Sequence, residues 1–129
     1  MSDIQTKEDI RFLVNSFYEL IRRDGKIGFF FNEVAQINWE DHLPKMYDFW
    51  ESIVLGNAKY SGNPMNTHVE LSRLHNMKPE HFDHWLSLWN NNIDQHFQGE
   101  NAEEAKNRAN QIAQLMRFKV EKFGNNAGI

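Results

Sequence analysis

Apolar residues near the start of the chain recur every three or four positions, which is the period of one face of a helix. This stripe is formed by Ile10, Leu13, Val14, Phe17 and Ile21. A hydroxyl at Thr6 and a carboxylate at Asp9 have the spacing of a capping box, which predicts where the helix begins. Gly25 follows the stripe and is a natural stop for this first helix.

The same period predicts a second helix over about residues 41–55. One of its faces carries His42, Met46, Phe49, Trp50 and Ile53. If Asp41 is the N-cap, Pro44 falls in the first turn, where a missing N–H is harmless because those donors have no helical partner. Between the two helices, residues 27–34 are short and apolar, which indicates a tight connection or a small helix.

The second half of the chain predicts one short helix and two longer ones. Gly62 and Pro64 mark a turn, after which residues 65–74 suit a short helix. Pro79 can open the next helix, whose stripe is Phe82, Trp85, Leu86, Trp89 and Ile93. A last helix over residues 102–122 would turn inward Ala105, Ala109, Ile112, Met116 and Val120.

No segment alternates like a strand for long, so we expect an all-α domain of about five main helices. The length of 129 residues suggests a single domain over residues 1–129. Polar stretches at residues 1–6 and 124–129 are expected to be flexible ends.

Composition narrows the classes of protein. The net charge is −4 and no basic block occurs, which argues against nucleic-acid binding, since that needs clustered cations. Cysteine is absent, which excludes disulfides and thiolate metal sites and is compatible with a cytoplasmic location. The N-terminus is polar and acidic, unlike a signal peptide, and no apolar run approaches the ~18 residues of a membrane span. Aromatic residues make up 13%, which suits either a pocket for a planar group or an ordinary aromatic core.

Three polar side chains on apolar stripes each allow two interpretations. His42 is either a histidine at the core boundary bonded to a carbonyl, or a polar group placed in an apolar pocket to meet a ligand. Tyr18 lies at the edge of its stripe, where a hydroxyl in water is the simpler interpretation. Trp85 is most simply a core residue, although its indole N–H needs a partner when buried.

Among the six histidines, His81 and His84 have the i, i+3 spacing of metal ligands. A hydrolytic zinc site needs a third ligand and a carboxylate base, and no HExxH motif is present. His68 follows the Gly62–Pro64 turn. The residues 56–67 before it can span up to about 40 Å when extended. The chain can therefore return and place His68 opposite His42, with room for a flat group between them.

Four blocks in order resemble the group III truncated haemoglobins. They are "FYELIRRDGKIGFFFN" (17–32), "WEDHLPKMYDFWESIVLG" (39–56), "YSGNPMNTHVEL" (60–71) and "HFDHWLSLWNNNIDQHFQGENAEEAKNRANQIA" (81–113). Together they cover nearly the whole chain. None of the seven glycines is adjacent to another, whereas groups I and II carry glycine pairs. The resemblance implies a globin-like, truncated two-over-two helical sandwich that binds haem b.

The resemblance also implies site residues. The histidine after the "Y-x-G-x-P" turn, His68, matches the proximal iron ligand of the family. Tyr18, His42 and Trp85 match its distal residues, in "FY", "W-x-x-H" and "HWL". Four further residues match haem-pocket positions of the family. They are Lys45, which would face a haem propionate, and Met46, Phe49 and Trp50.

With His68 on the iron, the sixth position would bind dioxygen, nitric oxide, carbon monoxide or cyanide. The resemblance therefore implies a protein that binds or carries oxygen. Composition and charge add the expectation of a cytoplasmic protein with no membrane or nucleic-acid partner. The alternative is a haem redox enzyme, a nitric oxide dioxygenase or a peroxidase-like catalyst, which would need a separate reductase. A third interpretation is a helical interaction module without a cofactor. Whether His42 gates the pocket or binds iron itself stays open.

Overall fold

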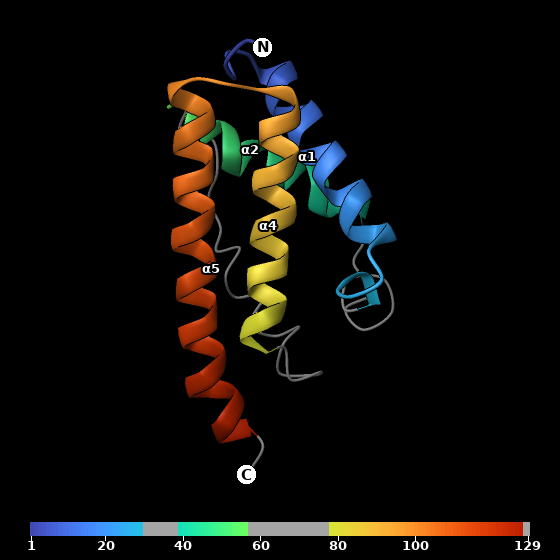
Figure 1. Ribbon diagram of the computed structural model, residues 1–129, viewed down its shortest axis with the longest axis vertical. Helices are drawn as coiled ribbons and strands as arrows, with labels where there is room; N and C mark the ends of the chain where they lie inside the picture. Colours follow the sequence, from blue (N-terminus) through green and yellow to red (C-terminus); the bar gives the residue numbers. More distant parts are fainter. Residues whose placement is uncertain (30–38, 57–77, 128–129) are drawn as a thin grey trace.

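The computed structural model describes residues 1–29, 39–56 and 78–127, with side chains to residue 119 (Figure 1). Its helices are α1 (Lys7–Arg23), α2 (Trp39–Val54), α4 (Pro79–His96) and α5 (Glu100–Ala127). Within these ranges every regular element is a helix, which confirms the all-α class. The short helix expected over residues 65–74 lies outside the described residues.

Helix α1 begins and ends where the pattern predicts. Thr6 Oγ1 accepts a hydrogen bond from the Asp9 N–H at 3.1 Å, and Asp9 Oδ2 accepts one from the Thr6 N–H at 3.1 Å. This capping box supplies acceptors for two backbone N–H groups that have no hydrogen-bond partner within the helix. All five stripe residues and Tyr18 are buried, so the periodicity gave the buried face of α1 correctly.

Helix α2 begins at Trp39, earlier than the expected start at about residue 41. Pro44 therefore lies inside the helix rather than in its first turn. The early start has a packing reason, because the Trp39 ring contacts residues of both α1 and α2. At the other end, Gly56 adopts φ 78°, the left-handed conformation that commonly stops a helix.

The helices pack as crossing pairs (Figure 1). The core between them is rich in aromatic side chains. α1 contacts α2 and α4, while α5 contacts α4 and α2. α4 and α5 lie side by side and run in opposite directions, joined by a short turn. Aromatic rings pack between the helices. The ring centroid of Phe17 in α1 lies 4.9 Å from that of Trp89 in α4. The Trp50 ring of α2 stacks on Trp89 with centroids 4.3 Å apart.

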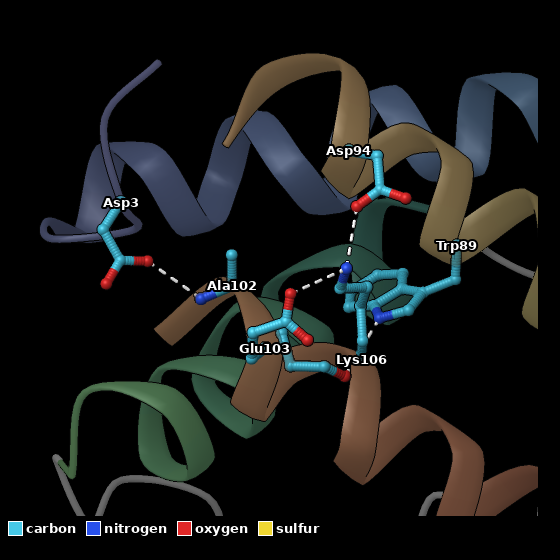
Figure 2. A network of polar contacts seen from close by, with 7 residues as sticks. Asp3, Trp89, Asp94, Ala102, Glu103 and Lys106 are labelled. Carbon is cyan, nitrogen blue, oxygen red and sulfur yellow. Dashed lines mark hydrogen bonds and ion pairs between the residues drawn. The ribbon is translucent and has the colours of Figure 1, made fainter. Parts of the chain in front are cut away.

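The turn between α4 and α5 is held by the N-terminal segment. Asp3 accepts hydrogen bonds from the N–H groups of Asn101 at 2.9 Å and Ala102 at 2.8 Å, so it caps α5 from far away in sequence. Figure 2 shows the bond to Ala102. Gly99 has φ 148°, and a Cβ there would lie 2.4 Å from Asp3 Cγ. Ile4, within the segment expected to be a flexible end, is fully buried.

Two further contacts set the alignment of α4 against α5 (Figure 2). Trp89 Nε1 donates to the Ala105 carbonyl at 3.1 Å, which satisfies the indole N–H in a fully buried position. Lys106 Nζ pairs with Asp94 at 2.8 Å and with Glu103 at 3.0 Å. α5 extends to Ala127, beyond the expected end at residue 122.

Candidate functional site

Tyr18 of α1 and His42 of α2 meet where the two helices cross. The Tyr18 hydroxyl oxygen lies 3.2 Å from His42 Nε2, which is hydrogen-bonding distance. Trp39 completes a cluster of three rings, with its centroid 5.3 Å from that of Tyr18 and 5.7 Å from that of His42. We call Tyr18, His42 and Trp39 the polar aromatic cluster. The hydroxyl of Tyr18 is therefore directed at a side chain rather than at water.

Burial controls the protonation of both polar groups. Tyr18 is only 3% exposed, and this burial raises the pKa of its hydroxyl, so it stays protonated. Burial also lowers the pKa of His42, and the positive charge of Lys45 lowers it further. The imidazole is thus neutral at neutral pH, with one protonated nitrogen and one lone pair.

A neutral imidazole gives this pair two states. With the proton on Nδ1, His42 Nε2 accepts the Tyr18 proton. With the proton on Nε2, His42 donates to the Tyr18 oxygen, and the phenolic hydrogen is left for a third group. In the first state the Tyr18 hydroxyl already donates its hydrogen bond to His42. In the second state the same hydroxyl can donate to a ligand.

The third predicted distal residue, Trp85, is buried in the same core and is 5% exposed. Its ring contacts Phe17 with centroids 5.6 Å apart, and Phe17 in turn contacts Tyr18 at 5.1 Å. Trp85 thus approaches the polar aromatic cluster through Phe17. The arrangement places an aromatic wall beside the polar groups of Tyr18 and His42.

The predicted pocket residues on α2 differ in burial. Met46 and Trp50 are buried, at 4% and 3% exposed, and Phe49 is partly buried with its ring 5.2 Å from that of Trp50. Lys45 is exposed, as a group meeting a charged ligand at the rim of a pocket would be. His68 lies outside the described residues, so its assignment as the iron ligand stays a prediction.

The histidine pair considered for zinc is engaged in other contacts. His81 Nδ1 accepts the Lys78 N–H at 2.8 Å, at the start of α4. His84 Nε2 lies 2.8 Å from Asp24 Oδ2, just after α1. Across the described ranges no group of three histidine or acidic side chains is placed to hold a metal. His75 lies outside those ranges.

Two residues of this region were not singled out from the sequence. Trp39 appeared only as a letter of the "W-x-x-H" motif, although it stands three residues before His42 and so shares its helix face. Asp24 accepts the N–H groups of Lys26 and Ile27 at 2.8 and 2.9 Å and binds His84. An aspartate followed by glycine at a helix end is a turn signal that could have indicated the backbone contacts.

Burial acts on the pKa of the Asp24 carboxyl by raising it, but the hydrogen bonds from His84, Ile27 and Lys26 outweigh this, and the net pKa is lowered. Asp24 is therefore ionised at neutral pH and joins the end of α1 to α4. In the described part of the chain, no helix combines the length and apolarity that crossing a membrane requires.

Comparison with known proteins agrees with this arrangement. The model of the bacterial-like globin family matches residues 2–120. The group 3 truncated hemoglobin ctb of Campylobacter jejuni is 29% identical over 121 residues, which cover 92% of this chain and 93% of that protein. The crystal structure of the group III truncated hemoglobin from Campylobacter jejuni superposes with a TM-score of 0.75 at 28% identity. That match covers 91% of this chain and 93% of the other.

These matches confirm the resemblance and the truncated globin fold that were expected from the four sequence blocks. They also agree with the packing seen here, in which α1, α2, α4 and α5 form crossing pairs. The chain belongs to the bacterial-like globin family and is a haem globin of the truncated type.

Proposed function

We propose that this globin binds haem b through His68 and holds dioxygen and other diatomic ligands against Tyr18, His42 and Trp85. The observation that carries the proposal is the contact between the hydroxyl of the buried Tyr18 and Nε2 of the partly buried His42. Between them a hydroxyl and a neutral imidazole have more hydrogen-bonding capacity than their mutual contact uses, and a ligand that accepts hydrogen bonds can take up the remaining donor.

The residues present fit such a group. Haem supplies an iron with a position for a diatomic ligand, and neutral imidazole is the axial base that a chain without cysteine can offer. Met46 and Trp50 offer apolar surface, and the exposed Lys45 offers a cation for a propionate. In the state with the proton on His42 Nε2, the Tyr18 hydroxyl donates to the ligand, which slows ligand release.

A second candidate function is redox chemistry, because the same hydrogen-bond donors suit it. Hydrogen-bond donors beside a bound oxygen stabilise the negative charge that develops when an oxygen–oxygen bond breaks. The alternative is thus a haem redox enzyme, a nitric oxide dioxygenase or a peroxidase-like catalyst. A separate reductase would supply its electrons, and both functions would take place in the cytoplasm. Slow dioxygen release argues against carriage, and rapid turnover of nitric oxide with a reductase argues for the enzyme.

The test is haem uptake by the wild-type chain and by two histidine variants. We expect the purified wild type to show a Soret band and His68→Ala to lose most of the haem, because the iron loses its axial base. His75→Ala is the matched control, since His75 follows nearby in the sequence, and it should retain haem. Full haem retention by His68→Ala with an unchanged ferrous spectrum would refute the assignment. A wild type without any Soret band would favour the cofactor-free module.

A further inference from the structure

The polar aromatic cluster joins the buried core to the molecular surface. Tyr18 is 3% exposed, whereas Trp39 is only partly buried. The two rings lie 5.3 Å apart between centroids, and His42 touches both of them. Side chains of two helices therefore form a continuous aromatic path that starts inside the protein and ends at a ring that solvent can reach.

The members of this path share a chemical property. In a chain without cysteine, tyrosine and tryptophan are the side chains that lose a single electron most readily. Rings in contact exchange electrons by tunnelling, without any movement of the chain. An oxidised phenol is a strong acid, so tyrosine oxidation needs a proton acceptor within hydrogen-bond distance. His42 Nε2 lies 3.2 Å from the Tyr18 hydroxyl and provides one.

We propose that Trp39, Tyr18 and His42 form a one-electron relay through which a small phenol at the surface reduces the haem pocket after a hydroperoxide has oxidised it. This inference rests on the haem-binding function proposed above and names the reductant class and its site of action. Trp39 is the surface contact for the phenol, Tyr18 is the inner carrier, and His42 holds the proton.

The reaction balances with two phenol molecules for each hydroperoxide. The oxygen–oxygen bond of ROOH breaks and takes up two electrons and two protons, which yields ROH and water. Each phenol loses one electron and one proton and leaves as a phenoxyl radical. Each electron passes from the phenol to Trp39 and then to the Tyr18 phenoxyl. The proton that His42 took from Tyr18 returns to the Tyr18 oxygen in the same step.

The other oxidisable rings in the described residues are placed less well for this role. Trp50, Trp85 and Trp89 are 3%, 5% and 0% exposed, so they offer a reductant no surface. Tyr47 of α2 donates its hydroxyl hydrogen bond to Asn15, an amide that is a far weaker base than the imidazole beside Tyr18. A guanidinium lies over Tyr47 and another over Trp39, so this contact does not distinguish the two rings. Tyr47 therefore serves as a matched control for Tyr18 on a neighbouring part of the fold.

The first experiment needs no haem chemistry. Azide radicals made by pulse radiolysis oxidise accessible tryptophan, and absorption distinguishes indolyl from phenoxyl radicals. In the purified full chain we expect the indolyl signal to convert to phenoxyl at a rate independent of protein concentration. In this measurement the electron moves from Tyr18 to Trp39, opposite to its direction in the relay, so the rate reports the electronic coupling between the two rings. In the relay, the phenol consumes the Trp39 radical and thereby draws electrons toward Tyr18. Trp39→Phe and Tyr18→Phe, which keep a ring in place, should lose this conversion, His42→Leu should slow it, and Tyr47→Phe should retain it. Unchanged conversion in Tyr18→Phe would overturn the relay.

The second experiment adds hydrogen peroxide to the haem-loaded chain, with guaiacol as the phenol. Without guaiacol, peptide mapping by mass spectrometry should find most tryptophan oxidation at Trp39, with the three buried tryptophans as internal controls. With guaiacol this oxidation should fall, and Trp39→Phe should lose most guaiacol oxidation. Equal guaiacol oxidation in Trp39→Phe would refute the proposal. Failure of the proposed function would show earlier, as a missing Soret band before peroxide is added.

Discussion

At the scale of single residues, the contact between Tyr18 and His42 is the feature on which the proposed function rests. From the sequence, a tyrosine hydroxyl in water was the simpler expectation, because Tyr18 lies at the edge of its stripe. The structure buries Tyr18 because α2 crosses α1 at this point and Trp39 covers its ring. His42 bonds a hydroxyl rather than a carbonyl, so the interpretation of His42 as an ordinary boundary histidine was incomplete.

Replacement of Tyr18 by phenylalanine tests its role toward a bound ligand. We expect Tyr18→Phe to raise the dioxygen dissociation rate by roughly three- to tenfold, since a net hydrogen bond contributes about 0.7–1.4 kcal/mol. Stopped-flow displacement of dioxygen measures this rate. Tyr47→Phe, which removes a hydroxyl from a side chain bonded to Asn15, should leave the rate unchanged. A rate in Tyr18→Phe equal to that of the wild type would remove Tyr18 from the ligand site.

At the scale of elements, local patterns and long-range contacts set different helix ends. The capping box of Thr6 and Asp9 lies within four residues and could be predicted from the sequence. The cap of α5 comes from Asp3, which lies 98 residues before Asn101 in the chain, and no local pattern indicates it. The start of α2 was placed too late for a similar reason, because tertiary contacts of Trp39 extend the helix past the local signals.

The cap of α5 can be tested by equilibrium unfolding in urea. We expect Asp3→Ala to lower the free energy of unfolding by about 0.5–2 kcal/mol, the usual contribution of an N-cap side chain. Asp3→Asn keeps an acceptor oxygen and should lose less, which separates the hydrogen bonds from the charge. If Asp3→Ala and the wild type unfold at the same urea concentration, the contact contributes nothing to stability.

At the scale of the whole molecule, several titratable groups make stability depend on pH in the same direction. Burial lowers the pKa of His42 and His81 below the ordinary value of 6.5. Burial acts to raise the pKa of Asp3 and Asp24, but hydrogen bonds outweigh it and hold both below 3.8. In all four cases the unfolded chain binds protons more readily than the folded chain, so acid favours unfolding.

We therefore expect the free energy of unfolding to fall as pH decreases below the ordinary histidine value of 6.5. It should fall further below the ordinary aspartate value of 3.8, because there the unfolded chain takes up protons at Asp3 and Asp24 first. Urea unfolding at a series of pH values measures this dependence. His42→Leu cannot be protonated and should show a shallower decline through the histidine range. A slope identical to that of the wild type would mean that His42 does not contribute.

The sequence by itself determined the all-α class, the buried face of α1 and the start of that helix. It also determined the family, because four ordered blocks carry enough specific residues to be distinctive. These features depend on helical period, local capping and short motifs, all of which act between residues close together in the chain. The candidate site residues Tyr18, His42 and Trp85 were assigned a role by the resemblance rather than by periodicity.

Only the tertiary structure decided which polar groups meet. The Tyr18–His42 hydrogen bond, the Asp24–His84 pair and the Asp3 cap each join residues far apart in sequence. Such contacts depend on how whole helices cross, which is set by the packing of many side chains at once. For the same reason Trp39 passed unnoticed in a motif, although it connects the buried hydroxyl of Tyr18 to the surface of the protein.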